Sequence, residues 1–268
     1  LAVAPADGWS VRNDVYYYGA DGGRSVRSGQ VEVGIDISLF YDYATFLYKP
    51  GTELLGGQLA FSGTLAGGHV DLDANLSVAG QPFGVSDDKT GLGDLTFGSY
   101  IYWPKDKWNL AWANYIVAPT GSYDVDEIAN TGLNIWTFET DFMATYFDPE
   151  KGRDYSVVVG YSYNWENDDT NYQTGDEFHV DVVLNQFLSE SFAIGLSAFH
   201  LRQLGGDRGS GAVLGDFKAR ASGIGPNFMW VRNIDEKDVA FILKWINEFD
   251  VEKRLEGDHV FASFAFSF

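Results

Sequence analysis

The sequence contains no cysteine and only two methionines in 268 residues. Without cysteine the chain has no disulfide framework and no thiolate metal site. It also lacks any apolar run near the roughly 20 residues that a transmembrane helix requires. Because 45% of the residues are nevertheless hydrophobic, the chain carries enough apolar surface to fold, and wholesale disorder is excluded.

Basic residues are also scarce. Lysine and arginine together number 18, against 38 aspartates and glutamates, which gives a formal net charge of −20. A surface that binds nucleic acid requires clustered lysine and arginine side chains. We therefore expect no nucleic-acid partner.

Aromatic residues, in contrast, make up 16% of the chain and accompany 31 glycines, a usage typical of β-barrels with aromatic girdles and tight turns. Apolar residues repeatedly alternate with polar or small ones, as in a strand with two different faces. The clearest alternation predicts one lipid-facing parity within residues 30–43: Val31, Val33, Ile35, Ile37, Leu39, Tyr41 and Tyr43. The opposite parity, which includes Phe40 and Asp42, would then face the barrel lumen.

We count 12 alternating segments along the chain. Short connections near residues 50, 105, 150, 190 and 235 alternate with longer ones near 22, 80, 126, 170, 212 and 254. Residues 19–23 are predicted as a Gly-rich turn, and residues 67–93 as a long polar loop. This organisation predicts an all-β fold, a transmembrane antiparallel up-and-down β-barrel with short periplasmic turns and long extracellular loops. The alternative is a soluble β-sandwich or lipocalin-like barrel.

The last stretch, His259 to Phe268, resembles the terminal strand by which outer-membrane barrels are recognised for insertion. Its expected lipid-facing residues are Val260, Ala262, Phe264, Phe266 and Phe268, and its expected lumen-facing residues are His259, Ser263, Ala265 and Ser267. We predict that it pairs antiparallel with Val11 to Tyr18 and closes the wall. Residues 11–268 then form a single barrel domain, and residues 1–10 an amino-terminal segment that plugs the lumen or trails in the periplasm.

Three stretches carry a family resemblance. Ala118 to Trp136 reads APTGSYDVDEIANTGLNIW, while Thr90 to Trp103 and Ser222 to Trp230 contain the shorter patterns G-x-G-D and G-x-G-P. Together they resemble the MetA-pathway phenol-degradation family of outer-membrane channels. The resemblance implies a monomeric barrel of the same strand number, implicated in uptake of hydrophobic, often aromatic, compounds across the outer membrane.

If the apolar parity faces lipid, the lumen has an acidic lining: Glu32, Asp36, Asp42, Asp94, Glu139, Asp141, Glu166, Glu177 and Asp181. Such a wall in a narrow pore favours cations over anions, unless the carboxylates are paired with arginines. The predicted inward aromatic residues are Phe40, Tyr100, Tyr115 and Phe187. They form either an apolar path or packing for the amino-terminal segment.

Two prolines fall where a strand needs ladder hydrogen bonds. Pro119 ends one predicted strand near Gly121, and Pro226 lies inside another beside Gly225. Because proline has no N–H to donate to a neighbouring strand, the wall is locally weakened at both places. These four residues are a candidate lateral gap through which an apolar solute passes between lumen and lipid. The alternative is a bulge or strand end without a transport role.

No catalytic residue, cofactor or metal site is predicted. His179 and Asp181 share a strand face, but the G-x-S-x-G motif of a serine nucleophile is absent. Asp124 to Asn130 is rich in oxygen ligands yet lacks the glycine and glutamate of an EF-hand loop. Three loop carboxylates are candidates for divalent cations shared with lipopolysaccharide: Glu166, Asp168 and Asp169.

The sequence therefore predicts an integral protein of the bacterial outer membrane with both termini periplasmic. We expect a monomer in contact with outer-membrane lipid and lipopolysaccharide. Its expected function is passive uptake of small hydrophobic or aromatic molecules, released laterally through the wall. The alternative is a diffusion pore for small hydrophilic, cation-preferring solutes, and what fills the lumen decides between the two.

Overall fold

The computed structural model describes residues 2–26, 31–78, 81–213, 217–234 and 237–267. Its strands are β1 (Gly8–Val26), β2 (Val31–Lys49), β3 (Glu53–Leu54), β4 (Gly57–Val78), β5 (Gln81–Leu92), β6 (Leu95–Lys105), β7 (Trp108–Ala118), β8 (Thr137–Asp148), β9 (Arg153–Asn164), β10 (Glu177–Ser189), β11 (Phe192–Gln203), β12 (Arg220–Ile234), β13 (Lys237–Glu252) and β14 (Glu256–Ser267). Within the described ranges the chain forms no helix long and apolar enough to cross a membrane.

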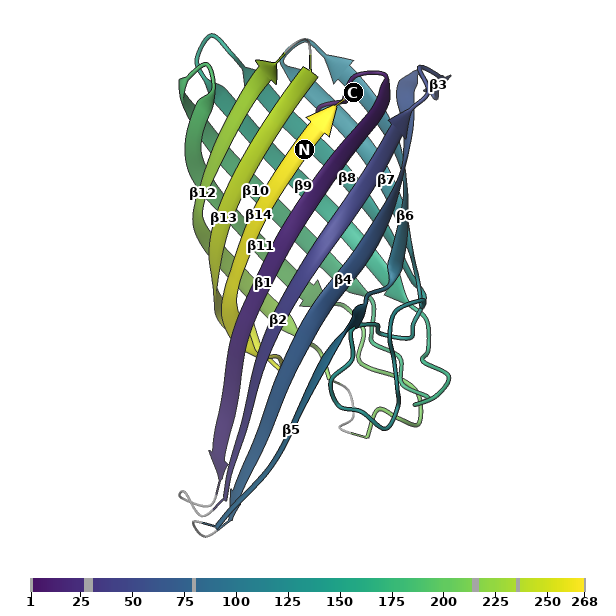
Figure 1. Ribbon diagram of the computed structural model, residues 1–268, viewed down its shortest axis with the longest axis vertical. Coiled ribbons are helices and arrows are strands. Elements are labelled where there is room, and N and C mark those ends of the chain that lie inside the picture. The colour runs from purple at the N-terminus through teal and green to yellow at the C-terminus, as the bar shows by residue number, and fades with distance from the viewer. Residues whose placement is uncertain (1, 27–30, 79–80, 214–216, 235–236, 268) are drawn as a thin grey trace.

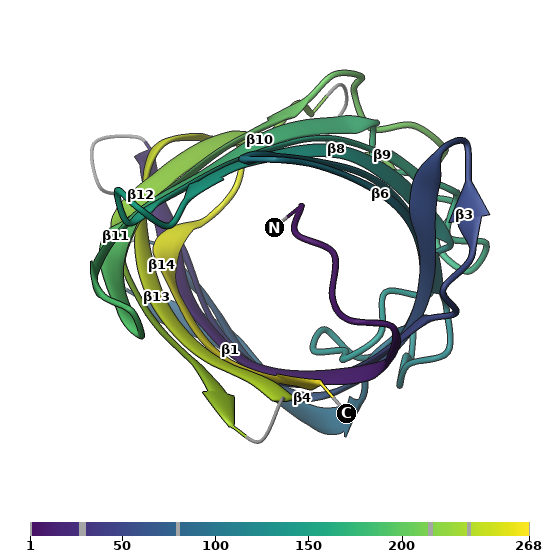
Figure 2. The ribbon, with the colours of Figure 1, turned by 90° about the horizontal axis from the view of Figure 1, so that it is seen from above.

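Twelve of the 14 strands form a closed antiparallel wall (Figures 1 and 2). The two strands outside it are β3 and β5. The predicted barrel is therefore confirmed. The wall closes where β1 pairs with β14, with Val11 opposite Phe266 and Tyr18 opposite His259. This is the predicted seam, and it gives the first and last wall strands the neighbour that a bilayer environment demands.

The connections are partly sorted by length between the two ends of the barrel. The long loops predicted near residues 126, 170 and 212 are confirmed, but the one predicted near 254 is wrong, because only residues 253–255 separate β13 from β14. The end that carries both chain termini, here called the turn end, holds the short connections at residues 106–107, 149–152 and 190–191 (Figure 1). The opposite end, here called the loop end, holds the long connections at residues 119–136, 165–176 and 204–219.

β1, β2, β4 and β5 continue past the loop end as a long projection (Figure 1). Two loop predictions are therefore wrong. Gly19–Gly23 lies inside β1, which stays paired with β2 as far as Val26. Residues 67–78 complete β4 and residues 81–92 form β5, and the two strands pair from Gly67 opposite Leu92 onward. In β4 this stretch does alternate, with Val70, Leu72, Ala74 and Leu76 on one parity and polar residues on the other, so the loop prediction overlooked a strand pattern that the sequence contains.

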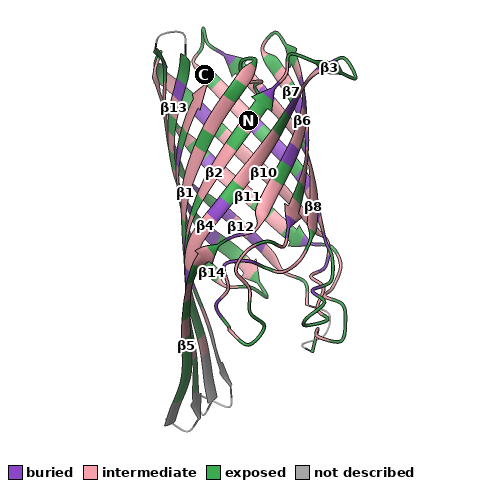
Figure 3. Ribbon diagram, turned by 45° about the vertical axis from the view of Figure 1, so that its right-hand side comes forward, coloured by how far each residue is buried: buried purple, intermediate pink, exposed green. Residues whose placement is uncertain are grey.

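Along the wall strands the burial class changes from residue to residue (Figure 3), as expected where successive side chains point to opposite faces of the wall. Directly opposed residues of neighbouring strands share a face. The pairing register therefore shows which residues of each strand belong to the lipid face and which belong to the lumen face. The lipid face exposes large apolar side chains on many strands: Phe61, Phe97, Leu110, Phe142, Leu196, Leu243 and Phe264. On β14, Phe264 faces outward while His259 and Ser263 bond to lumen groups, as predicted. Phe268 lies outside the described residues.

The predicted faces of β2 are reversed. Tyr41 points into the barrel, because it lies opposite Tyr16 on the lumen face of β1. Phe40 lies opposite Tyr17 on the outer face, and their exposed fractions are 48% and 45%. Asp42 shares the outer face with Phe40. The physical reason is that the lumen is itself aromatic, so an apolar parity does not identify the lipid side.

Candidate functional site

The amino-terminal segment, residues 2–7, runs inside the barrel (Figure 2). The backbone nitrogen of Ala2 donates a hydrogen bond of 3.0 Å to Thr145 Oγ1, and Ala2 is only 1% exposed. Ala2 packs against lumen residues of three wall strands: Ala60, Tyr102 and Ala111. At the start of the wall, Asp7 Oδ1 lies 2.6 Å from the nitrogen of the buried Lys49 side chain. The segment is thus anchored at both ends and narrows the lumen.

Much of the lumen face is aromatic. β1 and β2 contribute four neighbouring tyrosines: Tyr16, Tyr18, Tyr41 and Tyr43. The predicted residues Tyr100 and Tyr115 meet edge to face, with ring centroids 5.6 Å apart. Phe187 lies apart from them, 6.2 Å from the ring of Phe147, and Phe40 faces outward. The structure therefore assembles only two of the four residues of the predicted aromatic path.

A cavity of about 350 Å³ lies in the lumen between β1, β10, β11, β13 and β14. Its apolar walls are Tyr16, Phe199, Leu201, Ile246 and Phe261, and its polar residues are Arg12, Asp181, Lys244, Arg254, His259 and Ser263. Arg12 is paired with Asp14 at 2.7 Å, and Asp181 with His179. Lys244 makes no ion pair or hydrogen bond within the described ranges. The cavity is an aromatic chamber with one unpaired cation.

The wall between β12 and β13 contains a break in its pairing. β12 pairs with β13 up to Ile224 and again from Asn227, but Gly225 and Pro226 have no paired residue on β13. The two strands nevertheless stay close, because a Cβ on Gly225 would lie 1.8 Å from the carbonyl oxygen of Trp245. The wall is closed at this point, but its pairing is interrupted over two residues, one of which is a proline without an N–H to donate.

The other half of the candidate gap lies elsewhere. Pro119 follows the last residue of β7, as predicted, and Gly121 belongs to the loop after it. β8 to β11 separate β7 from β12, so the structure does not bring the two proline sites together. A Cβ on Gly121 would lie 2.7 Å from the Cα of Gly132. This glycine allows the two arms of the loop to touch.

The predicted lumen carboxylates do not form one acidic wall. Four of them face the lumen on β8 and β10: Glu139, Asp141, Glu177 and Asp181. The others were misplaced: Glu32 and Asp36 lie on the projecting part of β2, Asp42 on its outer face, Glu166 in an exposed loop and Asp94 in a loop anchor. Asp36 and Asp42 were misplaced because the faces of β2 are reversed, and Glu166 was misplaced because β9 ends at Asn164.

His179 joins three of the four lumen carboxylates. Its Nδ1 lies 2.7 Å from Asp181 Oδ2, which confirms the pair suggested by their spacing. Its Nε2 lies 3.4 Å from Asp141 Oδ1 and 3.8 Å from Glu139 Oε1. These last two contacts cross β9, which separates β8 from β10. Spacing along a single strand could not have revealed them.

Asp94 anchors the loop at residues 119–136. Its Oδ1 accepts hydrogen bonds from the backbone nitrogens of Thr120 and Gly121, at 3.0 and 2.8 Å. Its Oδ2 accepts a third from Leu133 at 2.8 Å. Asp94 thus holds both arms of the loop, and it is not a free charge of the pore.

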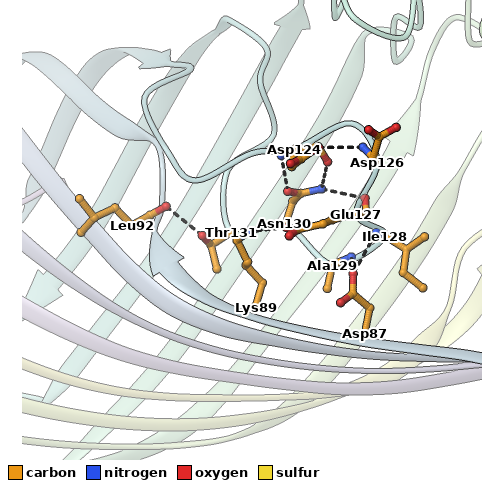
Figure 4. Close-up of polar contacts among 10 residues, drawn as sticks. All are labelled: Asp87, Lys89, Leu92, Asp124, Asp126, Glu127, Ile128, Ala129, Asn130 and Thr131. Carbon is orange, nitrogen blue, oxygen red and sulfur yellow. Dashed lines mark hydrogen bonds and ion pairs between the residues drawn. The ribbon is translucent and has the colours of Figure 1, made fainter.

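The loop at residues 119–136 also contacts β5 (Figure 4) and a side chain of the lumen face. Asp87 accepts hydrogen bonds of 3.0 Å from the backbone nitrogens of Ile128 and Ala129. Lys89 forms an ion pair with Glu127, and this hydrogen bond raises the pKa of the lysine. Inside the barrel, the hydroxyl of Tyr41 donates to the carbonyl oxygen of Thr131 at 2.9 Å. The loop therefore covers part of the mouth.

The loops at residues 165–176 and 204–219 are joined to each other by side-chain contacts. The hydroxyl of Tyr172 donates to Asp207 Oδ2 at 2.5 Å, and Arg208 pairs with Asp176 at 2.8 Å. Burial, followed by this hydrogen bond, raises the pKa of Tyr172 to about 12. Asp169 accepts a hydrogen bond of 2.8 Å from Asn134, so it links these loops to the one before. The sharing of divalent cations with lipopolysaccharide by Glu166, Asp168 and Asp169 stays a prediction.

Comparison with known proteins places the chain in a family. Residues 5–264 match the family described as "Putative MetA-pathway of phenol degradation". The chain belongs to this family. Its fold is similar to that of an outer membrane channel from Pseudomonas putida F1, with a TM-score of 0.74 and 15% identity over 98% of this chain and 96% of that chain. The translocator domain of the autotransporter NalP from Neisseria meningitidis is similar at a TM-score of 0.49 and 13% identity, over 98% and 90% of the two chains. The sequence matches none of the curated proteins.

In this member of the phenol-degradation family, the stretches that carried the resemblance have structural roles. G-x-G-D ends on Asp94, which binds the loop that contains the longest of these stretches. G-x-G-P ends on Pro226, at the pairing break beside the cavity. Lys244 was predicted from its parity as a lumen cation that opposes the carboxylates, and it does line the cavity, but sequence reasoning missed two other cavity residues, Phe199 and Phe261. The parity of these three residues along β11, β13 and β14 places them inside, but only the register shows that they meet.

Proposed function

We propose that the chain is a passive, non-catalytic channel of the bacterial outer membrane that admits small hydrophobic, chiefly aromatic, molecules. The observation that carries this proposal is the aromatic cavity beside the pairing break between β12 and β13. The monomer lies in outer-membrane lipid and lipopolysaccharide, with its turn end in the periplasm. The family and the fold support a channel, and the lumen supports the solute class.

The cavity offers what a small aromatic molecule requires. The rings of Tyr16, Phe199 and Phe261 provide walls for edge-to-face or offset stacking. Lys244 supplies a donor that is not engaged by another described side chain. A mostly apolar pocket with a few placed polar groups is the usual form of a small-molecule site. A phenol matches both parts of the cavity, because its hydroxyl oxygen can accept a hydrogen bond from Lys244 and its ring can pack on the aromatic walls. An aliphatic sugar matches these walls less well.

The competing reading is a pore for small hydrophilic cations, which the carboxylates on β8 and β10 favour. Against it, the facing part of the lumen carries Arg12, Lys244 and Arg254, so the wall is not uniformly negative. We expect proteoliposomes to swell slowly in arabinose. We expect Gram-negative cells that express the chain to take up a radiolabelled small aromatic faster than cells that do not. Brisk sugar permeation by the intact protein would refute hydrophobic uptake.

Lateral release follows from the position of the cavity. Lys244 and Ile246 line it from β13, on either side of the residue whose backbone approaches Gly225. A solute in the cavity therefore lies against a stretch of wall in which Gly225 and Pro226 have no paired residue on β13. Opening this short stretch requires fewer bonds to break than opening any fully paired part of the wall.

A cross-link across the break tests this route. The register on both sides places Pro226 opposite Trp245, and opposed residues of neighbouring strands lie within disulfide range. We expect the double variant Pro226→Cys/Trp245→Cys to lose most aromatic uptake when oxidised and to recover it when reduced. The native chain contains no cysteine, so the cross-link is unambiguous.

A matched control separates blocked release from general stiffening. Leu243→Cys/Ala262→Cys joins β13 to β14 at a fully paired position on the same outer face. Its uptake should be the same in the oxidised and reduced states. Equal uptake by both double variants under oxidation would show that solutes leave through the barrel axis.

A further inference from the structure

We propose that Glu139, Asp141 and His179 bind a divalent transition-metal cation of the kind that accepts mixed nitrogen and oxygen ligands, such as Zn²⁺. One ligand atom of each residue lies within 4.8 Å of the other two. The site departs from the sequence prediction of no metal. It goes beyond the proposed function, because hydrophobic uptake does not require it.

The distances suit a small cation. Two ligands at about 2.1 Å from a tetrahedral ion lie roughly 3.4 Å apart. His179 Nε2 lies 3.4 Å from Asp141 Oδ1 and 3.8 Å from Glu139 Oε1. Three protein ligands leave the fourth position open toward the lumen. One imidazole with two carboxylates favours zinc and its neighbours over the all-oxygen sites of calcium and magnesium.

The groups behind the ligands orient them toward a common point. Asp181 accepts the hydrogen bond from Nδ1 of His179 at 2.7 Å, which leaves the lone pair of Nε2 free for a metal. Ser162 donates to Glu139 Oε2 at 3.1 Å, which leaves Oε1 facing His179. Carboxylates that support a ligating histidine in this way are usual around bound metals.

Two further observations point to an occupant. The Asp141 side chain is only 8% exposed, and its Oδ1 has no hydrogen-bond partner although it points at His179. A buried carboxylate oxygen without a hydrogen bond is costly, and a cation removes that cost. Residue 160 on the intervening strand is glycine, where a Cβ would lie 1.9 Å from His179 Nε2 and 2.4 Å from Asp141 Oδ1. The missing side chain clears the space that the ligand atoms share.

A cation at this position joins β8 to β10 across β9. It also replaces a concentration of negative charge on the lumen wall with a nearly neutral centre. The carboxylates of β8 and β10 then attract fewer mobile cations from the pore. The site therefore sets the charge of the lumen as well as bracing the wall.

The test uses the full-length protein in detergent, stripped with EDTA and titrated with Zn²⁺ by calorimetry. We expect one Zn²⁺ per chain, unaffected by excess Mg²⁺ or Ca²⁺. Binding should weaken by more than about 100-fold in His179→Ala and Asp141→Asn, and by about 10- to 100-fold in Asp181→Asn, which removes only the supporting group. Co²⁺ should give a d–d absorption band that the His179→Ala variant lacks.

Two variants guard against misfolding and surface binding. Gly160→Ala keeps every ligand but fills the shared space, so it should also abolish binding. His200→Ala removes a histidine bonded to Ser222 outside the cluster and should bind as the unmodified chain does. Heat-modifiable gel mobility confirms that each variant is a folded barrel. Absence of a one-to-one complex, or binding that survives His179→Ala, overturns the proposal and leaves His179 as an imidazolium clamp between carboxylates.

Discussion

Removing residues 1–7 is expected to raise the single-channel conductance of the barrel severalfold. The segment runs through the lumen (Figure 2), and its Ala2 is only 1% exposed among side chains of the lumen face. The first wall strand begins at Gly8, so the deletion leaves all strand pairing intact. Ions then encounter the full width of the barrel. Conductance in planar bilayers, recorded for the deletion and the full chain, measures the effect.

A point variant separates loss of the segment from loss of its anchor. Thr145→Val keeps the volume of the side chain but removes the oxygen that accepts the buried hydrogen bond from Ala2. Losing such a bond costs about 1–3 kcal/mol, so the segment should leave the lumen in brief events of high conductance. If the deletion leaves the conductance unchanged, the narrowest part of the channel lies elsewhere.

Period-two alternation was sufficient to predict the strand number, three of the long loops and the closing seam. The seam was predictable because β1 and β14 each have one clearly apolar face, and Tyr18 indeed lies opposite His259. The projection beyond the loop end was missed, although β4 keeps an apolar parity there in Val70, Leu72, Ala74 and Leu76. The glycines and aspartates around these residues resemble a loop, and only the pairing of β4 with β5 shows that they are strand.

The faces of β2 show the limit of the rule that apolar residues face lipid. Tyr41 and Tyr43 lie inside, where they stack with ring centroids 5.6 Å apart. Phe40 belongs to the outer face. Both parities of β2 carry aromatic residues, so the alternation alone does not show which parity faces the lipid. Only the pairing with β1, whose Tyr16 bonds to His259 in the lumen, decides it.

The candidate sites were predictable only as far as a single strand extends. The pair His179 and Asp181 follows from their spacing on β10. The meeting of His179 with Asp141 requires the register of β8, β9 and β10, which no single strand specifies. The same holds for Lys244 and Phe199, which lie on β13 and β11 and meet at the cavity.

Replacing Asp94 by alanine is expected to release the loop at residues 119–136 from the mouth. Three backbone N–H groups, on Thr120, Gly121 and Leu133, then lose their acceptor. Hydrogen bonds to charged groups contribute roughly 1.5–3 kcal/mol each, and solvent can replace part of this at an accessible site. We expect a loss of about 3 kcal/mol in local stability, or roughly 100-fold faster exchange of these amides. Hydrogen exchange followed by mass spectrometry measures it.

The loop also touches the lumen through Tyr41 and Thr131, so its release should widen the mouth as well as expose the backbone. Asp88→Ala is the matched control, because this carboxylate is exposed on β5 and makes no described hydrogen bond or ion pair with the loop. It should leave exchange and conductance as they are. Unchanged protection of Thr120 and Leu133 in Asp94→Ala would mean that Asp87 and the Lys89–Glu127 pair hold the loop by themselves. Faster exchange without a change in conductance would mean that the loop covers the mouth without limiting it.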